Sequence, residues 1–569
     1  MAGRLTAEEA LDMFFSLPDD VDHSTDSEED DDVDEPAAVV TRSKDLDDSI
    51  PACINSSDAN SSSDSVAEHE SDDEDWGMRS LPCEKSIPKF SSLPPASSKL
   101  PETCTPLQIF EALFGEAEEI LVRETNLFAK QEKLKGWKDT TIQEMRAFLG
   151  MIIKMGFHKL ENRRDYWCTD SDLTVPAISC IMPRSLFFML LRALHANDNT
   201  TSVPKGEPGH DPLHKIRLLM TSVMSKFGEC YQPSSCYSID ESMVRFKGKK
   251  SFKQYMPLKP IKRGFKVWVR ADATTGFVIQ FDVYTGKESD GSGLGTRVVK
   301  KFTEKLAQTE CLVVFDNFFS SPELLQNLFE EGIYSVATVR QQRKGLPEIL
   351  KNKKKMKEGD HTFRVKGNVA ALQWPDKRLV NILTTAHNPS HTVNVSKKAK
   401  DGTKIDLQCP LAIVEYTKYM RGVDRFDQLR EYYTVSRKSR KWWMCLFYFI
   451  LDCALVNSYV LYRLSNVGCD DHIHFLIRLS RQLVNGYTSR KRSAALAPRR
   501  PSIKKPEKNL GVPDETRFAA TPHFPEGATS YKRCRYCSTA KNDKRSKIIC
   551  STCKVHLCVV PCFMKFHHK

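Results

Sequence analysis

Six cysteines and one histidine near the C-terminus have the spacing of metal ligands. Two Cys-x2-Cys pairs lie twelve residues apart, and a third cysteine pair and then the histidine follow them. A Cys-x2-Cys pair offers two thiolates at a spacing that suits tetrahedral Zn²⁺. The sequence therefore predicts about two structural zinc ions, held by Cys534, Cys537, Cys550, Cys553, Cys558, Cys562 and His567.

Seven ligands leave one position of two tetrahedral sites open, and His556 or His568 could fill it. We expect a cross-braced pairing, although the spacing does not assign each ligand to a site. The segment has few large apolar residues, so bound metal would supply much of its folding free energy. A RING-type ubiquitin ligase has similar spacing, but the rest of the chain argues against that reading.

Acidic residues in the middle of the chain could form a second metal site. Asp240 and Asp316 each end a short strand-like run, while Asp424 and Asp427 lie three residues apart ahead of a helical run. Acids at i and i+3 share a helix face, and strand-end carboxylates can converge with them on one rim. Oxygen ligands suit Mg²⁺, and two such ions promote phosphoryl transfer. An isolated Asp is more often a cap or turn residue, so the spacing alone is a weak signal.

Basic residues interleaved with aromatic ones form two stretches, 247–266 and 437–443. Backbone phosphates attract such stretches, and an aromatic ring beside them can stack on an unpaired base. A solvated charged surface is the alternative. Trp443 is expected in the core. The residues expected to contact DNA are Lys249, Lys253, Lys259, Arg263, Arg437, Lys438, Arg440 and Trp442.

The pattern of the chain indicates which elements position these residues. Helical periodicity dominates the parts before and after a central region of strands and then strand–helix alternation, which predicts an α/β layer. Thr274-Thr275-Gly276 is a hairpin signal between two strand-like runs. The expected parts are an acidic disordered tail (1–100), a helical region in two pieces (101–234 and 434–487), an α/β core in two pieces (235–345 and 411–433), an insertion (346–410), a basic linker (488–530) and the cysteine-rich domain (531–569).

Charge is distributed unevenly along the 569 residues. Residues 1–100 hold 26 Asp and Glu against seven Lys and Arg, a balance of −19. Because the whole chain has a net charge of +11, residues 101–569 carry +30. A body with this excess favours a polyanionic partner, most often nucleic acid. We see no secretory signal and expect no membrane span, because the best apolar run, 444–456, is short and contains Asp452. The cysteines are then expected in a reducing compartment.

Several motifs together resemble the piggyBac family of DNA transposases. They are Tyr237-Ser-Ile-Asp-Glu-Ser242, Val314-Phe-Asp-Asn-Phe-Phe-Ser320 and Arg421-Gly-Val-Asp-Arg-Phe-Asp-Gln428, with Phe252-Lys-Gln-Tyr-Met-Pro-Leu-Lys-Pro260 and Ser436-Arg-Lys-Ser-Arg-Lys-Trp442 beside them. The ordered set is specific, although each motif alone is weak. The resemblance covers the chain from about residue 101 to its end.

The resemblance implies a ribonuclease-H-like core with two Mg²⁺ ions held by Asp240, Asp316 and Asp424, and with Asp427 as a supporting acid. It also implies a homodimer that excises double-stranded DNA through hairpin ends and inserts it at TTAA, a cysteine-rich domain that binds transposon ends, and Trp442 near the cleaved end. The basic linker and the chromosomal substrate predict a nuclear location. The alternatives are a domesticated derivative that binds DNA without cutting it, and a zinc-dependent protein-interaction module on an inert body.

Overall fold

The computed structural model describes residues 76–78, 90, 94–257, 259–286, 293–351, 356–376, 378–398, 404–465, 470–489, 511–539 and 542–568. The chain divides into two units, Met1–Arg490 and Lys491–Lys569. The expected disorder of residues 1–75 and the basic cluster at 490–510 lie outside the described residues.

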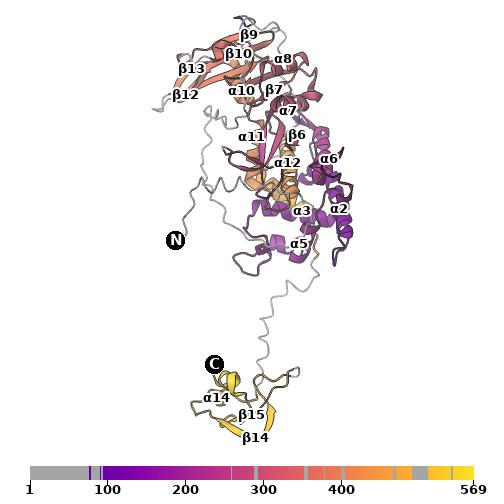
Figure 1. The fold of residues 1–569 in the computed structure, drawn as a ribbon, viewed down its shortest axis with the longest axis vertical. Coiled ribbons are helices and arrows are strands. Elements are labelled where there is room, and N and C mark those ends of the chain that lie inside the picture. Colours follow the sequence, from indigo (N-terminus) through magenta and orange to yellow (C-terminus); the bar gives the residue numbers. More distant parts are fainter. Residues whose placement is uncertain are drawn as a thin grey trace. The chain divides into compact units, whose positions relative to one another are not determined.

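A nine-stranded sheet runs through the larger unit (Figure 1). Its order is β4-β5-β3-β7-β8-β11-β10-β9, and β6 also pairs with β5. The pairs β3–β7 and β7–β8 are parallel, and the other pairs are antiparallel. The strands are β3 (Cys236–Arg245), β4 (Gln254–Tyr255), β5 (Arg263–Asp272), β6 (Val278–Val283), β7 (Leu312–Phe315), β8 (Tyr334–Thr338), β9 (Thr362–Lys366), β10 (Val369–Pro375) and β11 (Leu379–Thr384).

The predicted hairpin at 274–276 is confirmed between β5 and β6. The Asp272 carboxylate accepts hydrogen bonds from the backbone amides of Thr274 (2.8 Å) and Thr275 (3.1 Å). Gly276 follows at φ +78°, a conformation that an L side chain rarely adopts. The turn therefore fixes the register in which β5 pairs with β6.

Two helices connect the parallel strands and cover one face of the sheet. They are α7 (Leu294–Thr303) and α8 (Pro322–Glu330). Strand β7 is buried along its whole length, as is usual for a parallel strand covered on both faces. Val313 and Phe315 belong to the hydrophobic cluster beneath these helices, whereas Leu312 and Val314 belong to the cluster on the opposite face.

The segment expected as an insertion extends the same sheet. Strands β9, β10 and β11 form an antiparallel meander that joins the sheet through β8. Strands β12 (Thr392–Lys398) and β13 (Lys404–Pro410) form a separate hairpin, and α10 (Leu411–Tyr419) follows directly. Figure 1 shows these strands at one end of the larger unit.

Helices from both sides of the core form the other end of the larger unit (Figure 1). Helix α13 packs against α3, and α12 packs against α2, so the two sequence pieces build one hydrophobic cluster. Thr105 caps α2 with its side chain, in a capping box with Gln108. The helices are α2 (Pro106–Gln131), α3 (Ile142–Phe157), α5 (Arg184–Ala193), α6 (His214–Cys230), α12 (Trp442–Leu464) and α13 (His472–Val484).

Helix α12 is long and apolar enough to cross a membrane by length and composition alone. Its most apolar 18-residue window is 94% buried inside the protein, which is also true of many core helices. Trp443 lies in this buried part, as predicted, with 2% of its surface exposed.

Two aromatic residues of the segment expected to be disordered pack against the sheet. Trp76 and Phe90 are 6% and 7% exposed. Trp76 belongs to the cluster under α7 and α8, and Phe90 belongs to the cluster on the opposite face, where it contacts Tyr334 edge-on. Low aromatic content had predicted no packing in residues 1–100, and these two side chains pack all the same. Ala96 is buried as well, and Ser97–Ser98 (β1) pairs with Tyr231–Gln232 (β2), so the ordered part begins before the expected boundary at residue 101.

Candidate functional site

Asp240 and Asp316 lie side by side on neighbouring strands in the interior of the sheet, at the point where β7 ends. Strands β3 and β7 pair in parallel, with Ile239 opposite Phe315; Asp316 directly follows β7, whereas Asp240 lies in the middle of β3, which continues to Arg245 and does not end at Asp240 as the sequence had suggested. Neighbouring strands are about 4.8 Å apart. The register therefore brings together two carboxylates that are 76 positions apart in the sequence.

Helix α11 (Gly422–Tyr433) brings Asp424, in its first turn, to the same region. The amide of Val423 donates a hydrogen bond of 3.2 Å to the Ser238 hydroxyl on β3. A Cβ on Gly422 would lie 2.3 Å from that hydroxyl and 2.8 Å from the Asp272 carbonyl. Only glycine permits so close an approach, so Gly422 fixes how near Asp424 comes to β3.

Burial and repulsion between neighbouring carboxylates dominate the electrostatics around Asp240. Burial raises the pKa of Asp240 well above its usual range, and the charges of Glu241 and Asp316 raise it further. Lys259 forms an ion pair with Glu241 at 3.0 Å. Burial lowers the pKa of Lys259, but Asp240, Glu241 and Asp424 together raise it above its ordinary value. These carboxylates therefore disfavour one another's charged forms, and a bound cation would offset that repulsion.

A buried network holds one oxygen of Asp316. Its Oδ1 accepts hydrogen bonds from the Asn317 amide (2.6 Å) and from the Thr338 hydroxyl (2.7 Å). Tyr416, buried on α10, places its hydroxyl 3.3 Å from the Thr338 hydroxyl. Asp240 Oδ1 accepts in the same way from the amide of the next residue, at 2.7 Å. In both aspartates these bonds hold one oxygen.

Asp427 points from α11 toward β3. Its Oδ1 accepts a hydrogen bond of 2.7 Å from the Ser242 hydroxyl and lies 3.0 Å from the Arg430 guanidinium. Burial raises the pKa of Asp427, and Arg430 and Ser242 partly oppose that rise. These contacts join α11 to β3 beside Asp424.

The aspartates form an open rim and not a closed cage. Two groups of His and Cys side chains among the described residues have all their ligand atoms within 4.8 Å of one another, and both groups lie in the C-terminal unit. Asp240, Asp316 and Asp424 are spaced more widely. Carboxylates alone, at the end of a sheet, are a donor set that suits Mg²⁺.

The basic stretch at 247–266 forms the β3–β5 connection beside this rim. Lys249 and Arg263 are exposed, and the Arg263 guanidinium lies 5.1 Å over the Tyr255 ring. Lys253 donates a hydrogen bond to the Gly248 carbonyl at 2.7 Å. Lys259 is the member nearest the aspartates, through its ion pair with Glu241.

Trp442 connects the two basic stretches. Its ring packs edge-on against Phe252 and Phe265, at centroid distances of 5.5 and 6.3 Å. The Lys250 ammonium lies 4.7 Å over the same ring. A base that stacked on this face of Trp442 would have to displace Lys250.

Arg437 has a different environment from its exposed neighbours Lys438 and Arg440. Its guanidinium donates to the carbonyls of Met155 and Leu160, both at 2.7 Å, and to the Tyr166 hydroxyl at 2.9 Å. These bonds tie the residues before α12 to the end of α3. No local pattern distinguished Arg437 from its basic neighbours, so its bonds to backbone carbonyls could not be predicted.

The C-terminal unit holds the first ligand group, Cys534, Cys537, Cys558 and Cys562. Strands β14 (Pro525–Arg533) and β15 (Arg545–Cys550) pair antiparallel and position the two Cys-x2-Cys turns. Burial raises the pKa of Cys534, but backbone amides, Cys537 foremost, lower it to about 7 overall. Four thiolates at this spacing suit tetrahedral Zn²⁺.

The second group corrects the expected ligand set. It consists of His523, Cys550, Cys553 and His567, so the candidate for the eighth position is His523, and His556 and His568 lie in neither group. His523 Nδ1 lies 3.3 Å from Cys550 Sγ. His567 Nε2 lies 3.4 Å from Cys553 Sγ, and its Nδ1 is within 2.8 Å of the Phe563 carbonyl. That carbonyl holds the ring with Nε2 toward the thiolates.

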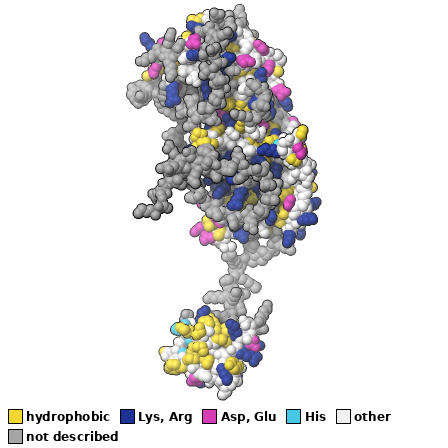
Figure 2. Space-filling model, viewed as in Figure 1, with side chains coloured by type: hydrophobic (Ala, Val, Ile, Leu, Met, Phe, Trp, Pro, Cys, Tyr) yellow, Lys and Arg dark blue, Asp and Glu magenta, His cyan; other side chains and the backbone are white. Residues whose placement is uncertain are grey.

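Ligands of the two groups alternate along the chain, which is the cross-braced pairing that we expected. His556 instead lies 2.9 Å from the Ser546 carbonyl, through Nδ1, inside the fold. Figure 2 shows hydrophobic side chains on one face of this unit. Its exposed apolar residues include Phe524, Tyr531, Val559, Val560 and Met564.

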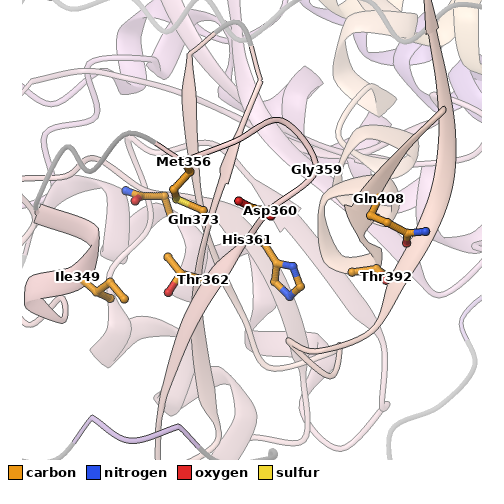
Figure 3. Close-up of a pocket in the computed structure, with 9 residues that line it drawn as sticks. All are labelled: Ile349, Met356, Gly359, Asp360, His361, Thr362, Gln373, Thr392 and Gln408. Atoms are coloured by element: carbon orange, nitrogen blue, oxygen red, sulfur yellow. The ribbon is translucent and has the colours of Figure 1, made fainter. Parts of the chain in front are cut away.

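A pocket of about 610 Å³ lies in the sheet extension, away from the aspartates. His361 and Thr392 line it on one side, and Ile349 and Gln373 line it on the other (Figure 3). The Gln373 amide donates to the Asn381 side chain at 3.0 Å. Asp360 is the one carboxylate among the described residues that line the pocket, so we assign the pocket no part in the chemistry of the carboxylate rim.

Fold and site together define a mixed α/β enzyme-like core with a carboxylate rim, a helical body and a cysteine-rich module. The family described as Transposase IS4 matches residues 105–459. The chain belongs to this transposase family, and within it to the piggyBac type.

Human proteins of this type are similar to the chain. PiggyBac transposable element-derived protein 3 of Homo sapiens is 29% identical over 66% of this chain and 64% of its own length. PiggyBac transposable element-derived protein 5 of Homo sapiens is 24% identical over 70% of this chain and 78% of its own length. The chain thus spans slightly less than two thirds of the first relative.

A solved structure has the same fold. It is a piggyBac transposase synaptic complex with hairpin DNA, with a TM-score of 0.61 and 23% identity, covering 82% of this chain and 98% of the other. At this identity the likeness shows the fold alone.

Proposed function

We propose that this protein is a DNA transposase that cleaves and joins strands at transposon ends and integrates at TTAA. Asp240, Asp316 and Asp424 would hold two Mg²⁺ ions, and Asp427 would support them. Bound there, the ions would stabilise the attacking and leaving oxygens of phosphoryl transfer. The observation that carries the proposal is the shared register of Asp240 and Asp316, with Asp424 brought in by the close approach of Gly422.

We further propose that the core is ribonuclease-H-like. Three antiparallel strands joined by hairpins, followed by two parallel strands reached through helices, support this assignment. The sheet extension then interrupts the core between β8 and α11.

DNA is the partner that the charge of the body supports. The exposed cations around β4 and before α12 would contact phosphates, and the C-terminal unit with its two zinc sites would bind the transposon ends. We propose a homodimer that acts in the nucleus. What supports the location is the chromosomal nature of the substrate.

A second candidate is a domesticated protein that binds DNA without cutting it. Relatives named as transposable element-derived proteins favour it. The carboxylate rim does not favour this second candidate, since Asp240, Asp316 and Asp424 are all present.

A cleavage assay separates the two candidates. The substrate is a duplex with the TTAA-flanked ends of the element that encodes the chain. We expect Mg²⁺-dependent nicking at those ends by the wild type and none by Asp316→Asn. The Asp316→Asn protein should bind the same DNA with the affinity of the wild type. Salt-sensitive DNA binding without nicking by the wild type would overturn the transposase proposal in favour of the non-cutting derivative.

A further inference from the structure

We infer that the outer edge of β9 is a strand-addition site whose occupant is the tryptophan segment Trp76–Met78 of this chain's own N-terminal region. The inference does not depend on catalysis. It concerns an interaction surface at the far end of the sheet from β4, together with the kind of peptide that the surface accepts.

The backbone contact is a short antiparallel bridge. Gly77 and Val365 exchange both hydrogen bonds, with the Gly77 amide 3.0 Å from the Val365 carbonyl and the Val365 amide 2.8 Å from the Gly77 carbonyl. Strand β9 is otherwise the last strand in the order of the described sheet. An edge strand presents unpaired amides and carbonyls that invite another strand, and here the N-terminal segment takes that position.

The side-chain contact supplies an anchor. Trp76 is 6% exposed and lies in the cluster that contains Leu328, Val369 and Ala371. Met78, two residues later, is 73% exposed. Backbone pairing with one side chain buried in a pocket is how extended peptides add to a sheet edge, where the pairing gives affinity and the pocket gives selectivity.

Charge favours the same occupant. Four acids, residues 72–75, directly precede Trp76 in the sequence, whereas Arg364 and Lys366 flank Val365 on β9. Opposite charges at the rim of an interface select a partner more than they strengthen it. The site therefore fits an extended peptide in which a tryptophan follows a run of acids.

A second anchor keeps the segment in place. Phe90 packs between Tyr334 and His387 on the opposite face of the sheet, at centroid distances of 5.7 and 6.4 Å. The chain is thus held on both faces, which raises the local concentration of Trp76 at β9 far above that of any free peptide.

Hydrogen exchange on the full-length protein tests the inference. Trp76→Ala should increase exchange of the Val365 amide at least about tenfold, since this amide loses its acceptor when the bridge opens. Met78→Ala is the matched control and should leave β9 unchanged, and unaltered exchange in β7 shows that the fold is intact. Unchanged protection of β9 in Trp76→Ala would overturn the inference.

Addition in trans tests whether the edge recognises the peptide by itself. A synthetic peptide with the sequence of residues 70–80, at millimolar concentration, should restore β9 protection in the Trp76→Ala protein. The same peptide with alanine in place of tryptophan should not. Failure of the native peptide to restore protection would mean that the edge is merely covered and is not a binding site.

Discussion

Thr338 is the residue that orients the Asp316 carboxylate toward its proposed metal. Its hydroxyl and the Asn317 amide both bond to Oδ1, so the other oxygen of Asp316 is the one left to face a cation. Thr338 itself is buried between β8 and α10, where Tyr416 approaches it. A positioning role therefore depends on the hydroxyl and not on contact with DNA.

We predict that Thr338→Val raises the Mg²⁺ concentration needed for half-maximal cleavage about tenfold, the effect of one hydrogen bond to a charged group. Thr338→Ser keeps the hydroxyl and should stay near wild type. The measurement is cleavage rate against Mg²⁺ at fixed DNA. Equal Mg²⁺ dependence of the valine and wild-type proteins would show that Thr338 does not orient the carboxylate.

Arg437 differs from the exposed basic residues that we propose contact DNA, because its guanidinium bonds to the protein's own backbone. Because its guanidinium satisfies the carbonyls of Met155 and Leu160, Arg437→Ala should cost about 2–4 kcal/mol of stability. Lys438→Ala, at the neighbouring exposed position, should leave stability nearly unchanged and reduce the salt dependence of DNA binding. Chemical denaturation and salt titration of both variants measure this. The opposite pattern in the two variants would contradict the assignment.

The C-terminal module shows which part of a metal site a sequence can reveal. Paired cysteines follow a ligand spacing, and seven predicted positions lie in the two groups. His523 is a lone histidine eleven residues before Cys534, with no partner nearby in the sequence. Its place depends on the β14–β15 pairing, which brings residue 523 to Cys550. No local pattern could have found it.

We predict two tightly bound zinc ions per chain, and only one in His523→Ala. Loss of one of four ligands should weaken the second site and leave the four-cysteine site loaded. His568→Ala is the control, because His568 lies in neither group. Metal analysis after dialysis against a weak chelator decides the matter. Two retained ions in His523→Ala would remove that histidine from the ligand set.

The sheet itself was predictable only in part. The hairpin at 274–276 has a turn signal and strand-like flanks, so it could be expected from the sequence. The addition of β9–β11 to the same sheet depends on pairing between β8 and β11, which are 40 residues apart. The burial of Trp76 could not be predicted either. An acidic composition indicates disorder, and one tryptophan does not change that composition.

Stability of the whole protein depends on histidines that are buried uncharged. Burial lowers the pKa of His195, His387 and His472 to about 4, from an ordinary 6.5. Between these values the unfolded chain takes up protons that the folded chain does not, so these residues make stability fall as pH falls. Glu118 and Asp452 act oppositely, because burial raises their pKa to about 7 and about 6.

His472 isolates this effect. Its ring stacks on Tyr459 at 4.5 Å, and its Nδ1 has no hydrogen-bond partner among the described residues. We predict that His472→Phe removes about 2 kcal/mol of the acid-induced loss between pH 7 and pH 5. Denaturation curves of both proteins at the two pH values measure the difference. An equal loss in both would show that His472 is not buried in its neutral form.

We propose that one rim of the larger unit binds divalent cations through Asp240, Asp316 and Asp424. Titration of Mn²⁺, followed by electron paramagnetic resonance on zinc-loaded protein, tests this binding most directly. We expect about two bound Mn²⁺ ions in the wild type, binding at least about tenfold weaker in Asp240→Asn, Asp316→Asn or Asp424→Asn, and a smaller loss of affinity in Asp427→Asn. Mn²⁺ binding that is the same in all five proteins would contradict it.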